Sequence, residues 1–312
     1  MGRFTRVAVT GGAGFIGSCL VRELLNRGYS VLVLDNFSSG CWENLRGLLG
    51  RDGLDVVEGD IRDRRVLRKV LKYVDAVVHL AALIDVEASV QNPYETHDVN
   101  VSGTLSVLME SVTAGVKRFV FISSTAVYGE TNPLPLRENY SLHPISPYAA
   151  SKAAAEAYCL AFSRCYGIEA VILRYFNVYG PGQRNSVYSG VITKFLKNAL
   201  NGMPLIVYGN GEQTRDFIYI DDVVSATVLA LEKEGLTDEV FNICTGKQFS
   251  VNKLLDFIRD ILGDNIQVVY DKPKKGDIAK NYGDTLKAEK MLGFKAKIDF
   301  KDGLKKMVNS FR

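Results

Sequence analysis

The stretch Val7-Ala8-Val9-Thr10-Gly11-Gly12-Ala13-Gly14-Phe15-Ile16-Gly17 decides the fold of this 312-residue chain. An apolar run, typical of a buried strand, leads into glycines spaced as in a dinucleotide-binding turn at the start of a helix. Gly11 permits the tight turn, Gly14 lets the backbone approach a pyrophosphate, and Gly17 lets helix and strand pack closely. The helix N-terminus offers N–H groups and a partial positive charge. The residues expected to bind phosphates are Gly11, Gly14, Phe15, Ile16 and Gly17.

The acidic residue Asp35 follows the apolar run at 31–34 and lies 18 residues after Gly17. A carboxylate here can accept hydrogen bonds from both hydroxyls of a ribose, and it would repel a 2′-phosphate. The order of strand, glycine turn, helix, strand and acid therefore favours NAD over NADP. The alternative is a structural glycine turn with a surface aspartate, and that order argues against it.

Apolar runs alternate with helical patterns throughout the first half of the chain. The runs expected to be strands are 7–10, 31–34, 56–57, 76–78, 119–122 and about 170–173, and helical spacing is found at 19–26 and 101–113. Strands that are apolar throughout and separated by helices indicate a parallel sheet covered on both faces. We therefore predict an α/β fold: a doubly wound parallel-sheet Rossmann domain with a smaller α/β substrate-binding domain.

The character of the sequence changes after about residue 176, where glycine-punctuated loops become longer. We predict an NAD-binding domain over residues 1–175 and a substrate-binding region over 176–312. Residues 215–220 resemble a strand, and we expect a strand near 215–240 to rejoin the first domain's sheet.

Composition excludes several classes of protein. The net charge of +3 is small and scattered, so neither nucleic acid nor a membrane surface is expected as a partner. The five cysteines form no CxxC pair, which indicates reduced thiols and no metal site. No apolar run reaches membrane-spanning length, and a strand beginning at residue 7 leaves no room for a signal peptide. We expect a cytoplasmic protein.

Two further segments are candidates for the cofactor site. Asp60 and Ile61 come just after the third expected strand and could hold the edge of an adenine. Leu80, Ala81 and Ala82 close the fourth strand, where small side chains suit a flat cofactor passing over strand ends. Taken alone, such an alanine pair is equally consistent with core packing.

The pair Tyr148 and Lys152 lies at i and i+4, so both side chains project from one helix face. A phenol has a pKa near 10, and lowering it by about 3 requires roughly 4 kcal/mol, which two close cations in a dry pocket can supply. Tyr148 could then accept a proton from a sugar hydroxyl, with Lys152 holding the cofactor ribose and Ser124 sharing the hydrogen bond. The alternative is a packed tyrosine with a solvent-facing lysine.

These residues resemble the extended short-chain dehydrogenase/reductase superfamily, and within it the nucleotide-sugar 4-epimerases. The resemblance covers essentially the whole chain. Its motifs are Thr10–Gly17, Asp35-Asn36, Gly59-Asp60-Ile61-Arg62-Asp63, His79-Leu80-Ala81-Ala82, Asn100-Val101-Ser102-Gly103-Thr104, Ser123–Gly129, Ser146-Pro147-Tyr148, Arg174–Pro181 and Thr214–Asp222.

The resemblance implies an activity and a set of site residues. Ser124, Tyr148 and Lys152 take the catalytic positions, Asn100 supports the nicotinamide half and Phe176 flanks it. Asn36, Ser38 and Gly40 join the cofactor site. Residues implied to bind a UDP-sugar are Ser124, Tyr148, Asn177, Val191, Tyr208, Arg215, Lys274, Asp277 and Asn281. The implied reaction is reversible oxidation of UDP-hexoses at C4 through a transient 4-keto sugar.

At several positions this chain departs from patterns of the family, and these departures indicate which branch of the family it resembles. Thr125 and Ala126 stand where related dehydratases place an acidic pair, which disfavours dehydration. Asp85 and Glu87 would repel a sugar carboxylate, unless both simply face solvent. Lys274 replaces a fork-shaped arginine. Asn281 replaces a tyrosine that limits space at C2, so N-acetylated hexoses could enter.

Other readings remain. The same scaffold carries 4,6-dehydratases and 4-reductases, and a non-catalytic dinucleotide-sensing protein is possible in principle, although the complete Ser124, Tyr148 and Lys152 set argues against it. The resemblance also implies a homodimer, formed through a four-helix bundle by the helices at 93–115 and 147–167. Cys159 and Ala161 on such a face could equally belong to the monomer core.

Overall fold

The computed structural model describes residues 4–130, 132–183, 190–273 and 278–311. A seven-stranded sheet forms the centre, and all of its neighbouring strands run parallel. In spatial order its strands are β3 (Leu54–Glu58), β2 (Ser30–Asp35), β1 (Arg6–Thr10), β4 (Ala76–His79), β5 (Arg118–Ser124), β6 (Glu169–Tyr175) and β11 (Glu239–Ile243). The strand order reverses between β1 and β4, the switch point at which such sheets bind ligands. The predicted doubly wound α/β fold is confirmed.

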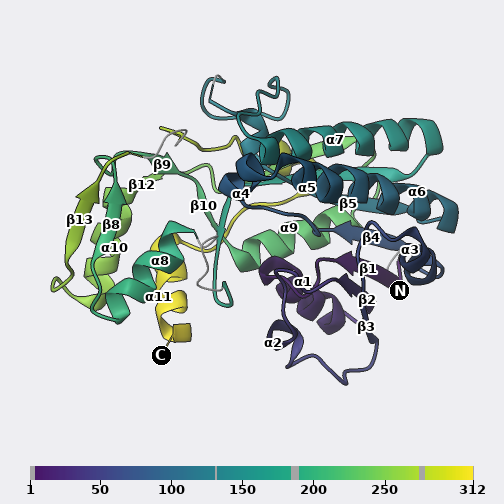
Figure 1. Cartoon of the computed structure of the whole chain (residues 1–312), viewed down its shortest axis with the longest axis horizontal. Helices are drawn as coiled ribbons and strands as arrows, with labels where there is room; N and C mark the ends of the chain where they lie inside the picture. Colours follow the sequence, from purple (N-terminus) through teal and green to yellow (C-terminus); the bar gives the residue numbers. More distant parts are fainter. Residues whose placement is uncertain (1–3, 131, 184–189, 274–277, 312) are drawn as a thin grey trace.

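Helices cover both faces of this sheet (Figure 1). α1 (Phe15–Asn26) and α9 (Ile220–Glu232) pack together on one face. α3 (Arg64–Leu71), α6 (Thr104–Ala114) and α7 (Pro147–Tyr166) cover the other. The short elements between them are α2 (Trp42–Leu45), α4 (Val86–Gln91), α5 (Pro93–His97), the π-helical turn η1 (Asp98–Gly103) and the 3-10 turn η2 (Thr125–Tyr128). The helix expected at 101–113 thus begins as a π-helical turn.

Local sequence explains where α7, which carries the Tyr148–Lys152 pair, begins and ends. The Ser146 side chain accepts a hydrogen bond from the Ala149 N–H at 3.1 Å, and Pro147 occupies the first turn, where its missing N–H costs nothing. Gly167 ends the helix with a φ of 74°, a backbone conformation that glycine adopts without strain.

The second half adds three two-stranded sheets beside the main one. β7 (Asn177–Tyr179) pairs with β10 (Phe217–Tyr219), β8 (Leu205–Tyr208) with β13 (Val268–Asp271), and β9 (Thr214–Arg215) with β12 (Phe249–Ser250). The accompanying helical elements are α8 (Val191–Leu200), α10 (Val251–Leu262), η3 (Ala288–Leu292) and α11 (Phe300–Phe311), most of which form the lobe on the left of Figure 1.

Of the range 215–240 expected to rejoin the main sheet, the strand-like segment 215–220 does not do so. The segment breaks at Asp216, whose carboxylate is fully buried and bound by backbone N–H groups of Thr245 and Gly246. β10 therefore pairs with β7 outside the main sheet. The strand that joins the sheet is β11, beside β6.

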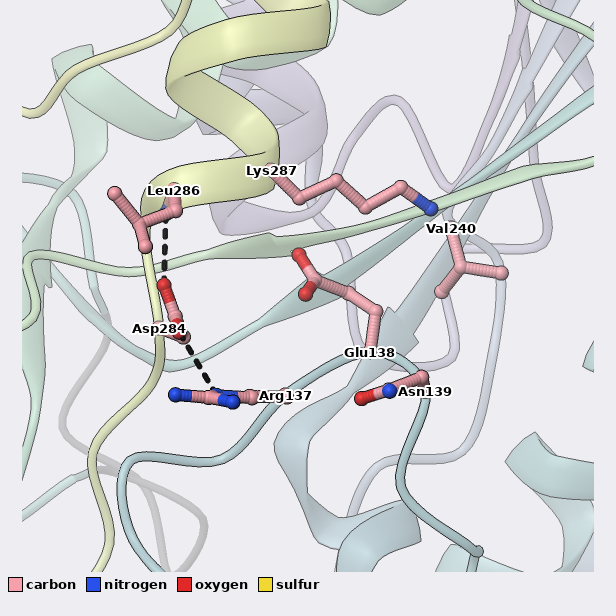
Figure 2. Close-up of a pocket in the computed structure, with 7 residues that line it drawn as sticks. All are labelled: Arg137, Glu138, Asn139, Val240, Asp284, Leu286 and Lys287. Carbon is pink, nitrogen blue, oxygen red and sulfur yellow. Dashed lines mark hydrogen bonds and ion pairs between the residues drawn. The ribbon is translucent and has the colours of Figure 1, made fainter.

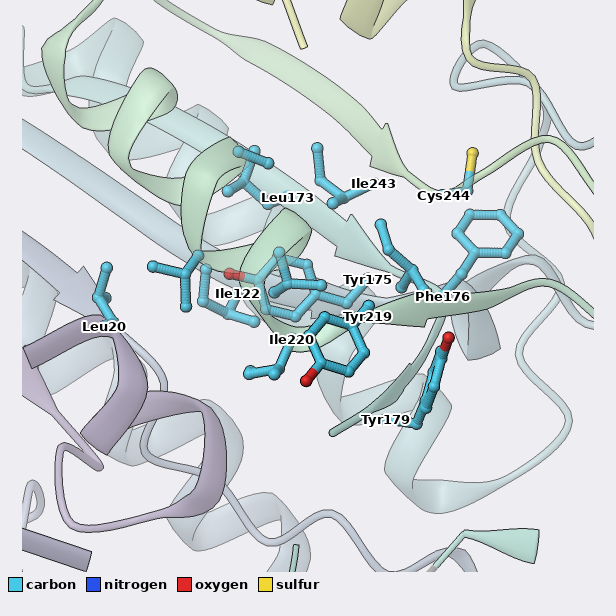
Figure 3. Packing of buried hydrophobic residues seen from close by; sticks show 14 of the residues in the cluster. Leu20, Ile122, Leu173, Tyr175, Phe176, Tyr179, Tyr219, Ile220, Ile243 and Cys244 are labelled. Carbon is cyan, nitrogen blue, oxygen red and sulfur yellow. The ribbon is translucent and has the colours of Figure 1, made fainter. Parts of the chain in front are cut away.

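One hydrophobic core runs through both halves. It joins Leu20 of α1 and Leu173 of β6 to Tyr179, Tyr219 and Phe300 of the second half. Figure 3 shows Tyr175, Tyr219 and Tyr179 among the residues of this core. The halves are therefore continuous in packing, and the boundary at 175/176 stays a prediction. Among the described helices, none is long and apolar enough to cross a membrane.

Candidate active site

The glycine turn between β1 and α1 leaves space only for backbone. A Cβ atom added to Gly17 would lie 2.2 Å from the Gly11 carbonyl oxygen, and one added to Gly11 would lie 2.8 Å from the Ala81 nitrogen. Gly11 also has a φ of 70°. Gly14 caps α1 with no side-chain hydrogen bond, and Phe15 and Ile16 begin that helix. The first turn of α1 thus presents main chain at the switch point, as a pyrophosphate requires.

Asp35 ends β2 beside this turn and is 7% exposed. Its Oδ2 accepts from the Ala13 N–H at 2.9 Å and its Oδ1 from the Phe37 N–H at 2.8 Å. Burial raises the pKa of the carboxyl, and these two hydrogen bonds oppose the rise. Each oxygen retains a second lone pair for a ribose hydroxyl. The residues present therefore fit the adenosine half of NAD.

The loop after β2 surrounds the same place. Asn36 Oδ1 accepts hydrogen bonds from the N–H and the hydroxyl of Ser38, and Asn36 Nδ2 donates to Asp60 at 3.2 Å. Arg62 grips Asp60 with its guanidinium, which lowers the pKa of that carboxyl to about 2. A Cβ on Gly40 would lie 2.9 Å from the Ala13 backbone. Asp60 is held as a carboxylate, with Ile61 buried next to it.

Residues at the end of β4 are fixed by a buried relay. His79 lies between Thr10 Oγ1, 2.6 Å from its Nδ1, and Thr104 Oγ1, 2.9 Å from its Nε2. Burial lowers the pKa of His79 to about 3, so its ring is neutral. The Thr10 carbonyl also accepts a hydrogen bond from the Leu80 N–H, and the Thr10 hydroxyl accepts one from the Ala81 N–H. Ala82 follows directly, so 80–82 lie beside the glycine turn.

Tyr148 and Lys152 are both buried in the interior, as expected for a catalytic pair and not for a solvent-facing lysine. Lys152 Nζ donates to the Ile122 carbonyl at 2.8 Å and lies 4.9 Å from the centre of the Phe121 ring. Burial lowers the pKa of Lys152 to about 8. The phenol differs from expectation: burial raises the pKa of Tyr148, and a hydrogen bond from Ser124 lowers it, while no cation of the described residues contributes to the shift.

Ser124 is the last residue of β5 and is half-buried. Its hydroxyl also accepts from the Ala126 N–H at 3.2 Å, which caps the following turn. The structure therefore brings Ser124 and Tyr148 together at the carboxyl end of β5, with Lys152 one helical turn behind.

The two residues expected around the nicotinamide have different settings. Asn100 is buried, exchanges two hydrogen bonds with the Leu83 main chain and donates to Ser151 on α7. It therefore braces the catalytic helix. Phe176 follows β6, and Figure 3 shows its ring beside Cys244. A Cβ on Gly283 would lie 2.6 Å from that ring, which packs Phe176 against the 283 segment.

The residues expected to hold a nucleoside diphosphate come from separate segments of the second half. Asn177 donates to the Asp216 carbonyl at 3.2 Å, and Arg215 donates to the Ile278 carbonyl at 2.6 Å. Val191 begins α8, and Tyr208 ends β8 with 36% of its surface exposed. Lys274 and Asp277 lie outside the described residues.

Thr125 and Asn281, singled out for different reasons, contact each other. Asn281 Nδ2 donates to Thr125 Oγ1 at 3.2 Å, and Asn281 is 2% exposed. The position that would carry a dehydratase acid is thus joined to the position expected to limit space at C2. Asp85, by contrast, caps α4 by accepting from the Ala88 N–H at 2.5 Å, and Glu87 is exposed. Helix capping accounts for Asp85 without a role in substrate choice.

A cavity of about 500 Å³ lies away from these residues, beside the edge strand β11. Figure 2 shows Lys287 and Glu138 reaching toward it and Arg137 bonded to Asp284. None of the predicted site residues lines it. We therefore locate the candidate site by the strand ends and not by this hollow.

Comparison with known proteins agrees with this geometry. The model of the NAD dependent epimerase/dehydratase family matches residues 7–244. This chain belongs to that family. The family is the one that the sequence motifs resembled, and NAD, the cofactor predicted from the glycine turn and Asp35, is the cofactor on which it depends.

Similar proteins include epimerases and other enzymes that act on nucleotide sugars. A relative from Mycolicibacterium smegmatis, a UDP-glucose 4-epimerase, is 36% identical over 98% of both chains. The solved UDP-glucose 4-epimerase of Thermotoga maritima, with UDP-glucose, has a TM-score of 0.93 at 40% identity. The UDP-N-acetylglucosamine 4-epimerase of Methanobrevibacter ruminantium, in complex with UDP-N-acetylmuramic acid, has a TM-score of 0.94 at 40% identity. Each covers 98% of both chains, and other similar proteins are named decarboxylases or dehydratases.

Sequence reasoning missed several residues that support the site. Ser89 Oγ accepts from the Tyr148 N–H at 3.1 Å and so fixes the start of α7. The His79 relay and a buried partner of Arg174, Glu156, were also missed. Only Glu156 had a signal in the sequence, since it lies four residues after Lys152 on the same helix face.

Proposed function

We propose that this protein catalyses the NAD-dependent 4-epimerisation of UDP-hexoses, interconverting UDP-galactose and UDP-glucose through a transient 4-keto sugar. The observation that carries the proposal is the hydrogen bond between the half-buried Ser124, at the carboxyl end of β5, and the buried Tyr148, with the buried Lys152 one helical turn behind. The relatives named as UDP-glucose 4-epimerases support the choice of substrate.

The chain's own residues divide the work. Tyr148 accepts the proton of the C4 hydroxyl, and Ser124 donates a hydrogen bond that stabilises the phenolate. When bound, NAD would supply a positive charge and the site that accepts and gives back the C4 hydride. The Gly11–Gly17 turn and Asp35 hold the adenosine diphosphate half, and Lys152 hydrogen-bonds the cofactor ribose.

The residues expected near C2 of the sugar favour a broad substrate range. Asn281 is smaller than a tyrosine and is turned onto Thr125, so the space at C2 is bounded by two short polar side chains. We extend the proposal to UDP-GalNAc and UDP-GlcNAc. The solved relative named UDP-N-acetylglucosamine 4-epimerase supports this extension.

Elimination of water is the main rival activity on this scaffold. Once C4 is oxidised, it needs a base that removes the C5 proton and an acid that protonates the leaving C6 hydroxyl, and Thr125 and Ala126 supply neither at neutral pH. The Thr125 hydroxyl is also engaged by Asn281. These residues favour epimerisation, in which the same C4 position is oxidised and then reduced.

We also propose a cytoplasmic homodimer built from α5, α6 and α7. Large apolar side chains are exposed on these helices: Tyr94 at 88%, Tyr158 at 40% and Met109 at 38%. Cys159 lies in the core between the sheet and its helices, so it belongs to the monomer core. Analytical ultracentrifugation of wild type and Tyr158→Glu tests the dimer; a wild-type monomer would contradict it.

The function itself is tested by NMR of four substrates incubated with NAD and the purified protein. We expect UDP-galactose and UDP-GalNAc to convert to their C4 epimers. UDP-glucuronate should release no carbon dioxide, and dTDP-glucose should give no 4-keto-6-deoxy product. Conversion of only the last two would replace epimerisation by decarboxylation or dehydration.

A further inference from the structure

Two charged side chains are buried directly behind the catalytic pair. Glu156 of α7 is 2% exposed and Arg174 of β6 is 4% exposed. The guanidinium grips the carboxylate with two nitrogens: Nη2 lies 2.7 Å from Oε2 and Nε lies 3.0 Å from Oε1. Such a pair is costly to desolvate and is weak grounds for stability by itself. Stabilisation of the fold therefore does not explain why this ion pair is buried behind Tyr148 and Lys152.

The carboxylate of this pair connects to the strand end that carries Ser124. Ser123 donates its hydroxyl to Glu156 Oε1 at 2.5 Å, and Ser123 immediately precedes Ser124. On the same helix face, Lys152 donates to the Ile122 carbonyl. Residues 122–124 are thus held to α7 at two points, one on each side of the peptide that leads into the catalytic serine.

The guanidinium is fixed from its other side. Arg174 Nη1 donates to the Tyr128 hydroxyl at 2.8 Å, and Tyr128 donates to Asn242 Oδ1 at 2.7 Å. The Asn242 N–H donates to Glu138, on the rim of the cavity in Figure 2. Arg174 is therefore anchored to the edge strand β11, while the carboxylate of Glu156 stays on the side of α7.

The titratable groups around Lys152 are His79, Cys159, Tyr148 and Glu156, and the last of these is paired with Arg174. His79 on β4 is neutral because burial lowers its pKa to about 3. Burial raises the pKa of the Cys159 thiol and of the Tyr148 phenol, so both are protonated when Lys152 titrates. From β5, Lys152 meets only the Ile122 carbonyl and the Phe121 ring among the contacts described. Glu156 lies one turn further along the same helix face, with its carboxyl group bonded to Arg174.

We propose that Glu156, held in place by Arg174, is a positioning residue of the active site: it keeps the Lys152 ammonium charged and fixes the end of β5 that presents Ser124. This role rests on the proposed function only where catalysis is concerned. Burial lowers the pKa of Lys152 to about 8, and the neighbouring Cys159 and Glu156 oppose that fall. Without Glu156 the ammonium would lose its proton at a lower pH.

The direct test needs no substrate. Protein labelled with ¹⁵N at the lysine Nζ atoms is titrated by NMR, and the Lys152 signal is assigned by its loss in Lys152→Met. We expect Glu156→Gln to lower the titration midpoint by about 1 pH unit, and Glu156→Asp to restore most of it. An unchanged midpoint in Glu156→Gln would overturn the proposal.

The matched control is Glu169→Gln. Glu169 pairs with the fully buried Arg118 at 2.8 Å, at the amino ends of the same strands β5 and β6. This variant also removes a carboxylate from a buried arginine, and we expect a comparable loss of thermal stability with no change in the Lys152 midpoint. A midpoint shifted equally by both variants would make the effect a general consequence of destabilisation.

Kinetics separate this role from the proposed function. If wild type interconverts UDP-galactose and UDP-glucose, the alkaline fall of kcat/KM should move to lower pH in Glu156→Gln by the same amount as the NMR midpoint. If wild type shows no epimerisation, the proposed function fails while the NMR result still decides the role of Glu156. A fall in kcat/KM equal at every pH, with no displacement of the limb, would count against the proposal.

Discussion

The cofactor half and the substrate half of this site are built by different means. In the cofactor half, backbone geometry dominates: the Gly11–Gly17 turn has no room for side chains and presents the start of α1. In the substrate half, the expected site residues come from separate segments, and side-chain hydrogen bonds hold the loops between them together. Asp216 alone binds Thr245, Gly246 and Gly283. The difference indicates that the proposed cofactor half is shaped by main chain, while the proposed substrate half depends on buried polar side chains.

The largest effect should come from the chemistry common to both halves. Tyr148→Phe removes the proton acceptor but keeps the ring, which is 8% exposed and packed. We expect kcat to fall by about 10²–10⁴-fold, with NAD and UDP-sugar affinities within a few-fold of wild type by calorimetry. Unchanged turnover would refute the assigned base.

The cofactor half is tested by Gly17→Ala. The new methyl group would lie 2.2 Å from the Gly11 carbonyl oxygen, so α1 must shift away from the turn. We expect overpacking to cost about 1–3 kcal/mol and NAD affinity to weaken accordingly, by about 5–100-fold. The control is Gly47→Ala, where nothing lies within 4 Å of the added atom and NAD binding should not change. Equal NAD affinities for the two variants would contradict the role of the tight glycine turn in NAD binding.

The substrate half is tested by Asp216→Asn. The amide places N–H groups against the N–H donors that the carboxylate now accepts, which costs about 1–3 kcal/mol. We expect weaker binding of UDP and a lower melting temperature, with NAD affinity retained. Asp264→Asn, at an exposed site, should leave all three at wild-type values. Loss of NAD binding in Asp216→Asn would show that the halves are not separable.

The smallest effect concerns pH and the His79 relay. The pKa of His79 is lowered to about 3 in the folded state, against about 6.5 in an unfolded chain. The unfolded state therefore binds more protons below pH 6.5, and stability contributed by the neutral ring is lost as the pH falls from about 6.5 toward 3. Between pH 7 and pH 5 this amounts to about 2 kcal/mol.

Urea unfolding of wild type and His79→Asn at both pH values measures that contribution. The variant should be less stable at pH 7 but should lose about 2 kcal/mol less than wild type on acidification. The exposed His97→Asn serves as the control and should keep the wild-type pH dependence. Parallel losses in wild type and His79→Asn would contradict a buried neutral histidine.

Sequence predicted the sheet well where strands are apolar throughout, as in β1, β2 and β5. It failed at 215–220, since a run that resembles a strand does not reveal that Asp216 is buried and bound by distant backbone. It missed β11, whose polar Glu239 and Asn242 interrupt the apolar pattern because they bond to Lys287 and Tyr128. The paired contacts Glu156–Arg174 and Thr125–Asn281 join residues that only the folded chain brings together.

The central claim is that C4 of the hexose loses and regains the same hydride while Tyr148 moves the proton. The most direct measurement uses UDP-galactose carrying deuterium at C4, incubated with wild type and NAD in ordinary water and followed by NMR. We expect UDP-glucose that retains deuterium at C4. Protium at C4 of the product, or no conversion between the epimers, would contradict it.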